Sequence, residues 1–195
     1  RETAQRLLFE RQDKDAVEPL RTMAETATLP QGRVHALNVL NAQGALSEEM
    51  ISHALAATHP EIRQAALEAV STWKEVSPKL DDALIALAAD TSPRVRMSLA
   101  FLMSGPVSPT LKGLEQLVLA GVDDTWQRQA LLLLPPASFG AASMMVLKLP
   151  ESPARADFFQ QGFFLAGSHR EAAEGEADRH HRKELVHLLL GHLKD

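Results

Sequence analysis

The chain of 195 residues contains no cysteine and no tyrosine, and only 5% of its residues are aromatic. The missing cysteines exclude a disulfide framework, a thiolate zinc site, a cysteine nucleophile and a c-type haem motif within this segment. No Gly-rich phosphate loop and no nucleophile-elbow motif occurs either. The most apolar run, residues 130–134, is far shorter than the roughly 20 residues that span a bilayer. We therefore expect no catalytic residue, no cofactor and no direct membrane insertion.

Residues that favour strands are also scarce. There are 3 Ile and 11 Val against 30 Leu and 29 Ala, and the last two are strong helix formers. Hydrophobic residues make up 45% of the chain, which is ordinary for a globular protein. The net charge of −5 argues against a general nucleic-acid binder, because such proteins usually present a basic face. The composition therefore predicts an all-α protein.

An arginine recurs along the chain at a nearly constant interval. Each copy stands two residues before a mostly small residue and opens an apolar stretch; the copies are Arg1, Arg33, Arg63, Arg96 and Arg128. Their spacings are 32, 30, 33 and 32 residues, and Arg155, 27 residues further on, opens a sixth, degraded copy. A period of this length is typical of stacked helical repeats.

The clearest copies share the order polar residue, proline, any residue, β-branched residue, arginine; they are residues 59–63 and 92–96. Proline suits a first helical turn, and Ser92 and Asp124 are candidate N-caps. We expect the residue before the arginine to enter the core. We expect the arginine to reach back toward an acid such as Asp90. A structural ladder between repeats is the favoured interpretation, and a ligand-binding row of arginines is the alternative.

Second helices are predicted between these starts, over residues 47–57, 78–89 and 109–120, with Gly121 as a C-terminal stop. Each unit of roughly 30 residues is then a helical hairpin that cannot bury its apolar face alone. We therefore predict a right-handed α-solenoid of about five to six hairpins. Residues 1–150 form the repeats, and residues 151–195 form C-terminal helices that are a degraded repeat or a cap.

Two-helix units that open with Pro, a β-branched residue and Arg resemble HEAT repeats over residues 1–150. More narrowly, three segments resemble the HEAT section of large planctomycete-type membrane-bound dehydrogenases: TAQRLLFER at 3–11, DKDAVEPL at 13–20 and GRVHAL at 32–37. In that family a β-propeller precedes the repeats and a haem-binding Cys-x-x-Cys-His domain follows them. The resemblance implies a spacer or docking domain of an exported or periplasmic redox protein. The chain opens at Arg1 inside a helix-like pattern, and we expect it to belong to a longer protein.

The densest polar cluster lies near the C-terminal end and contains four histidines: His180, His181, His187 and His192. The spacing of His180 and Glu184 matches part of a zinc-binding helix, in which ligands stand four residues apart. A solvated helix face opposite an apolar stripe explains the same residues. We favour the solvated face and assign no metal site.

Each of the two tryptophans could pack in the core or lie on the surface as part of a partner-binding site. Trp126 is expected in the core, because it is assigned to the β-branched position of its repeat. Trp73 lies near the end of a first helix, so exposure and partner binding are more plausible there.

Four of the seven phenylalanines cluster within one short segment: Phe158, Phe159, Phe163 and Phe164. We expect a terminal helix that seals the stack, with a docking face for a neighbouring domain as the alternative. The candidate binding residues are accordingly Trp73, Phe159 and Phe163.

These observations predict a non-catalytic helical-repeat scaffold for protein–protein or interdomain binding, with protein partners or neighbouring domains of the same chain. Small-molecule and nucleic-acid partners are not expected. The alternative is an enzyme built from HEAT-like units, such as an alkylpurine DNA glycosylase, for which the tryptophans and arginines supply a faint groove signature. A lyase-type repeat acting on bilin attachment is neither supported nor excluded by any motif.

Overall fold

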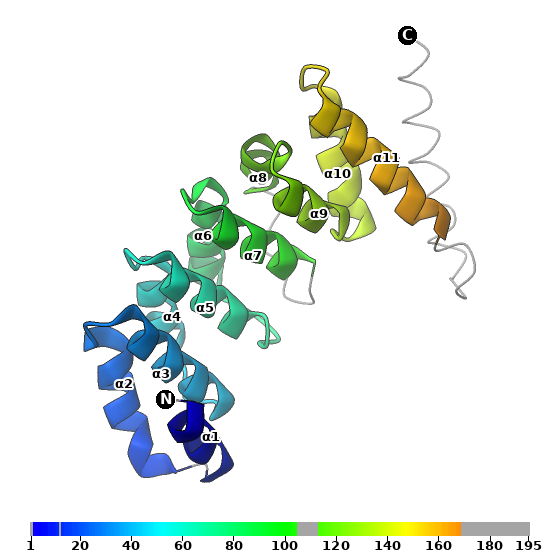
Figure 1. Cartoon of the computed structure of the whole chain (residues 1–195). Helices are drawn as coiled ribbons and strands as arrows, with labels where there is room; N and C mark the ends of the chain where they lie inside the picture. The colour runs from blue at the N-terminus through cyan, green and yellow to red at the C-terminus, as the bar shows by residue number, and fades with distance from the viewer. Residues whose placement is uncertain (1, 12, 105–112, 169–195) are drawn as a thin grey trace. The chain divides into compact units, whose positions relative to one another are not determined.

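A computed structural model of the chain describes residues 2–11, 13–104 and 113–168, and every regular element in these ranges is helical (Figure 1). The prediction of an all-α protein is confirmed for the part of the chain that is described. The helices are α1 Glu2–Arg11, α2 Val17–Thr26, α3 Pro30–Ala42, α4 Glu48–Leu55, α5 Pro60–Val70, α6 Pro78–Ala86, α7 Pro93–Met103, α8 Leu114–Gly121, α9 Thr125–Leu132, α10 Pro136–Leu147 and α11 Pro153–Ser168. Two 3₁₀ turns, Lys14–Ala16 and Leu87–Ala89, precede α2 and follow α6.

The chain divides into two compact units, Arg1–Gly113 and Leu114–Asp195. The sequence analysis places the end of the regular repeats at residue 150, and this boundary remains a prediction. In each unit, short helices alternate between those that carry a repeated arginine and those that do not. We call α3, α5, α7, α9 and α11 the arginine-bearing helices, and α4, α6, α8 and α10 the second helices.

In the first unit the arginine-bearing helices pack side by side, α3 against α5 and α5 against α7. The second helices also contact one another, α4 against α6, while α2 packs against α3 and α4 against α5. Small residues permit these close approaches: Ala36 in α3 and Ala66 in α5 are fully buried at the same register position. Each helix therefore buries its apolar stripe mainly against a neighbouring helix.

Helix starts follow the expected proline and capping signals. Proline occupies the first helical position of α3, α5 and α7, where its missing N–H costs nothing. Ser47 and Asp124 cap α4 and α9 by accepting hydrogen bonds from the amides of Met50 and Gln127. Ser92 stands at the N-cap of α7, but its side chain makes no capping hydrogen bond.

The second helices lie where the periodicity predicts them. Residues 47–57 contain α4, and residues 78–89 contain α6 with its 3₁₀ extension. Within 109–120 the helix α8 begins at Leu114, and the residues from 105 to 112 lie outside the described ranges. None of the described helices is long and apolar enough to cross a membrane.

The second unit repeats the same pairing, with α8 packed against α9, α10 against α11, α8 against α10 and α9 against α11. Phe158 of α11 is fully buried and stacks on Phe139 of α10, with ring centroids 5.6 Å apart. A Cβ on Gly162 would lie 2.9 Å from the Phe139 ring, so glycine is what lets α11 pass this ring closely. Phe158 therefore anchors α11 in the core.

Leu84 tests the assignment of the α6 stripe, because it is fully buried. Leu84→Asp would bury an unpaired carboxylate, and we expect unfolding free energy to fall by about 4 kcal/mol in a denaturant titration. Ala86→Asp is the matched control, since Ala86 is exposed on the same helix. We expect its cost to stay below about 1 kcal/mol. Equal costs for the two variants would contradict the assigned stripe.

Candidate functional site

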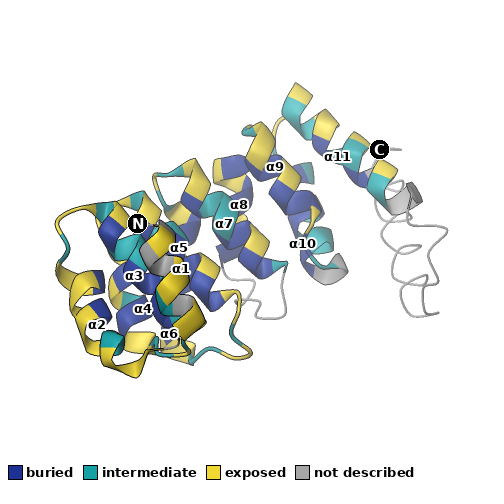
Figure 2. Ribbon diagram, turned by 60° about the horizontal axis from the view of Figure 1, so that its bottom comes forward, coloured by how far each residue is buried: buried dark blue, intermediate teal, exposed yellow. Residues whose placement is uncertain are grey.

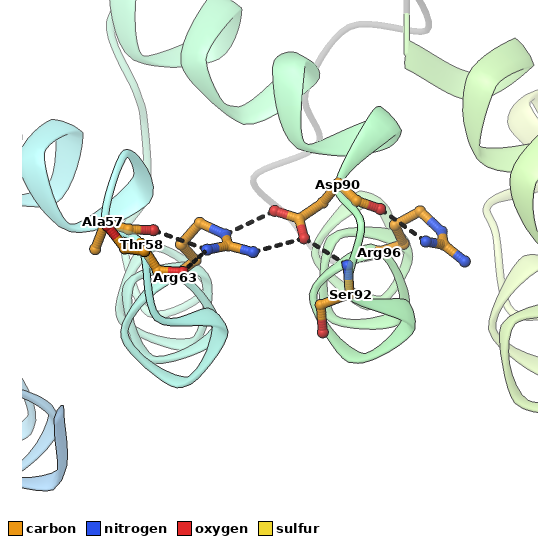
Figure 3. Close-up of polar contacts among 6 residues, drawn as sticks. All are labelled: Ala57, Thr58, Arg63, Asp90, Ser92 and Arg96. Carbon is orange, nitrogen blue, oxygen red and sulfur yellow. Dashed lines mark hydrogen bonds and ion pairs between the residues drawn. The ribbon is translucent and has the colours of Figure 1, made fainter.

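A connected polar cluster in the first unit surrounds Arg63 of α5 (Figure 3). Its guanidinium donates from Nε to Asp90 Oδ2 at 2.6 Å and from Nη2 to Asp90 Oδ1 at 2.7 Å. Its third nitrogen, Nη1, donates to the carbonyls of Ala57 and Thr58 at 2.7 and 2.9 Å. Both side chains of the ion pair are largely buried, with 11% of the Arg63 side chain and 6% of the Asp90 side chain exposed. The pair joins the turn before α5 to the turn before α7.

Asp90 is the centre of this cluster because it accepts hydrogen bonds from Arg63 of α5 and from residues at the start of α7. Besides the bidentate contact with Arg63, its Oδ1 accepts the amide of Ser92 at 2.8 Å. Its backbone carbonyl accepts from Nη1 of Arg96 at 2.7 Å. The expected contact between a repeated arginine and Asp90 is present here, with one difference. The carboxylate binds the arginine of the preceding repeat, whereas the arginine of its own repeat takes the carbonyl.

The same arginine contact recurs in both units. In four arginine-bearing helices Nη1 donates to the carbonyl of the residue six positions earlier, at 2.6–2.8 Å: Arg63 to Ala57, Arg96 to Asp90, Arg128 to Val122 and Arg155 to Leu149. Arg33 makes a related contact, from Nε to the carbonyl of Ala24 at 2.7 Å. The four carbonyls that accept from Nη1 lie one or two residues after the preceding helix ends, so each arginine is bound to the turn that leads into its own helix. We call this contact the arginine clamp.

In the second unit the clamp is linked to α11 by a looser ion pair. Arg128 Nη2 lies 3.4 Å from Asp157 Oδ2, and the Arg128 side chain is buried while that of Asp157 is half exposed. The Nε of Arg128 is buried with no hydrogen-bond partner. Arg63 has both of these nitrogens on one carboxylate, so the two links have the same chemistry but different geometry.

Trp126 lies on the surface, which corrects the expectation that it is a core residue. Its side chain is 74% exposed, whereas Gln127 is fully buried. Counting from the arginine shows why the prediction was wrong. The core residue directly precedes the arginine, as Ile62 precedes Arg63, and in this repeat that residue is Gln127. Trp126 takes the outward position that Glu61 occupies in α5.

Gln127 is accommodated in the core by Gly121. Its Nε2 donates to the carbonyl of Leu117 at 3.1 Å, so a carbonyl of α8 receives the buried amide. A Cβ on residue 121 would lie 2.1 Å from Gln127 Cδ. The glycine that was predicted as a helix stop therefore also makes room for a polar side chain.

The outward face of α9 is apolar where that of α5 is charged. Trp126 and Leu133 take the register positions of Glu61 and Glu68 in α5; Leu133 is the C-cap residue of α9 and is 55% exposed. The two residues are seven positions apart, and therefore lie on the same side of the helix after two turns. Two large apolar side chains are therefore exposed on the side of α9 that corresponds to the acidic side of α5.

Helix α11 extends this face. Gln129 of α9 donates from Nε2 to Oε1 of Gln161 in α11. Gln129 lies about one turn from both Trp126 and Leu133, and Phe164, which is 74% exposed, lies one turn beyond Gln161. We call these five residues the α9–α11 face. Figure 2 shows exposed turns on both helices.

The three candidate binding residues are not brought together by any contact described here. Trp73 belongs to the first unit, is partly exposed in the turn after α5, and donates its amide to the carbonyl of Val70 at 2.9 Å. Phe159 is partly exposed on α11 and meets the edge of Phe158, with ring centroids 5.4 Å apart. Phe163 lies on the same helix, but its side chain is outside the described residues. Their role in binding remains a prediction.

The four C-terminal histidines, His180, His181, His187 and His192, also lie outside the described residues. Among the residues that are described, no group of three or more His, Asp or Glu is placed to hold a metal ion. Comparisons with protein families, with curated proteins and with solved structures find no match for this chain.

The Arg63–Asp90 pair gives a direct test of the ladder. Arg63→Ala leaves the buried Asp90 carboxylate unpaired, and we expect a loss of about 3–5 kcal/mol in unfolding free energy. Arg94→Ala, at an exposed position of α7, is the control and should change stability by no more than about 0.5 kcal/mol. In the Asp90→Ala background, Arg63→Ala should cost clearly less, since the pair is already broken. Strict additivity of the two changes would contradict the proposed coupling.

Gly121→Ala tests the contact with Gln127, because the contact should reverse the sign of the substitution's effect on stability. Helix propensity alone predicts that alanine stabilises α8 by up to about 1 kcal/mol. The clash with Gln127 should reverse this, with a net loss of about 1–3 kcal/mol. In a Gln127→Ala background the clash is gone, so the same substitution should become neutral or stabilising. Thermal and urea unfolding of the four proteins measure both effects; a loss in both backgrounds would rule out the Gln127 contact as the cause.

Proposed function

We propose that this chain is a right-handed, HEAT-like α-solenoid of about five to six hairpins that serves as a non-catalytic scaffold for protein–protein or interdomain binding. The observation that carries the proposal is the division of roles between the two faces of the arginine-bearing helices. On one side, each clamp arginine binds a carbonyl at the end of the preceding hairpin. On the outward side the residues differ between helices: they are Glu61 and Glu68 on α5, and Trp126 and the C-cap residue Leu133 on α9.

Within each unit, the packing of the helices supports the interpretation of the chain as helical repeats. Arginine-bearing helices contact one another in sequence, and the second helices do the same. Five such helices follow the 27–33-residue spacing of their arginines. Stacked hairpins of this kind provide extended surfaces with a rigid backbone, which suits binding without chemistry.

The arginine contacts favour a scaffold over a nucleic-acid enzyme. A groove that binds phosphates needs cationic side chains free to contact them. Here Arg63 and Arg128 are buried and bound to carbonyls and carboxylates, and Arg155 donates to a carbonyl. The repeated arginines that suggested a groove are therefore engaged in holding the fold together.

The resemblance to the HEAT section of membrane-bound dehydrogenases suggests which domains the scaffold would serve. A propeller-like domain on one side and a haem c domain on the other would place it as a spacer in an exported redox protein. The parent protein would then be an oxidoreductase, and the haem motif would lie outside this segment, whose sequence contains no cysteine.

The test is to express this chain and the segments that flank it in its natural gene as separate proteins, and to measure their association by calorimetry. We expect at least one flanking domain to bind, and we expect haem absorbance only in proteins that contain the downstream segment. A labelled DNA duplex serves as the competing ligand, measured by anisotropy at low and moderate salt. DNA affinity that falls steeply with salt, together with no association of the flanks, would overturn the proposal in favour of the enzyme.

A further inference from the structure

We propose that the α9–α11 face is a self-association surface, and that its occupant is the same face of a second copy of this chain. The inference rests on the proposed role as an interaction scaffold and names one partner for it. The face consists of Trp126 and Gln129 on α9, the α9 C-cap residue Leu133, and Gln161 and Phe164 on α11, all within the second unit.

The charge distribution favours self-association at this face. Helix α9 carries a single charged residue, Arg128, which is buried and donates to Val122 and Asp157. Helix α11 carries only Arg155 and Asp157, and both are engaged, by the carbonyl of Leu149 and by Arg128. The whole chain has a net charge of −5, so two copies repel one another over most surfaces. The five residues of the face are themselves uncharged, and the half-exposed Asp157 carboxylate, one turn before Gln161, is paired with Arg128, so self-association here adds little repulsion between like charges.

The chemistry of the face is also self-complementary. A two-fold interface places the same patch of both copies in contact, so every group must suit its own kind. Apolar rings and a Leu side chain meet this condition. The amides of Gln129 and Gln161 meet it too, because each carries both a donor and an acceptor. Glu61 and Glu68, at the corresponding positions of α5, would repel their own copies.

The area available indicates a weak dimer. With Trp126 and Phe164 both 74% exposed and Leu133 55% exposed, these side chains offer on the order of 400 Å² per copy. Two copies would bury about 800 Å² through them, against roughly 1,200–2,000 Å² for a stable interface. Adjacent parts of α9 and α11 would have to supply the remainder. We therefore expect a dimer with a dissociation constant on the order of micromolar, formed reversibly as concentration rises.

The experiment is sedimentation equilibrium of the intact chain from low to high micromolar concentration. The weight-average mass should rise from 21.3 kDa toward twice that value. Leu133→Gln should weaken the dimer at least tenfold. Leu119→Gln is a matched control, because Leu119 is 58% exposed on α8 of the same unit, and it should leave the dimer unchanged. In a Trp73→Phe background, the fluorescence of Trp126 should shift to the blue as the dimer forms.

A mass that stays at 21.3 kDa throughout would overturn the inference. So would equal weakening by Leu133→Gln and Leu119→Gln, which would indicate non-specific association. The same variants, tested for binding to the flanking domains, separate this inference from the proposed function. If the chain is monomeric and Leu133→Gln abolishes flank binding, the second copy is excluded and the scaffold proposal stands. If neither dimer nor flank binding occurs, both fail.

Discussion

The hairpins of this chain are too short to bury their apolar stripes alone, and the contacts between successive hairpins depend on a buried guanidinium. Arg63, at the start of one hairpin, bonds to two carbonyls at the end of the preceding hairpin and to the Asp90 carboxylate at the start of the following one. A point charge could not satisfy this geometry, since the bidentate contact needs the planar fork of arginine. The neighbouring Ala and Leu layers pack against helices whose ends are held in this way.

This arrangement leaves the outward positions of the arginine-bearing helices free to vary. They make no contribution to the clamp, so their identity is set by solvent or by a partner rather than by the fold. In α5 these positions are acidic, and in α9 they are Trp126 and Leu133. The proposed scaffold role would depend on this separation, because a binding surface could then change without loss of the packing between helices.

Much of the fold could be predicted from the sequence, because helix starts and stripes depend on local signals. Proline at the first helical position, Asp124 as a cap and the stripe around Leu84 all lie where spacing and propensity place them. The assignment of Trp126 to the β-branched core position of its repeat is wrong by one residue. Alignment on Arg128 would have assigned the core position to Gln127, but a buried glutamine is expected only when its carbonyl partner and the space above Gly121 are known.

The candidate site was harder to predict for a physical reason. Exposure of an apolar residue depends on how neighbouring helices cover it, and this is a tertiary property. Phe158 and Phe164 have the same side chain on the same helix, yet one is fully buried and the other is 74% exposed. Their difference follows from contact with Phe139, which lies on another helix.

The central claim is that neighbouring hairpins of the first unit are stable only together. Native-state hydrogen exchange of the intact chain, followed helix by helix as denaturant is raised below the unfolding transition, tests it most directly. The account predicts that the central amides of α5 and α7 open with one common free energy. Exchange of α7 at a much lower opening free energy, while α5 stays protected, would contradict it.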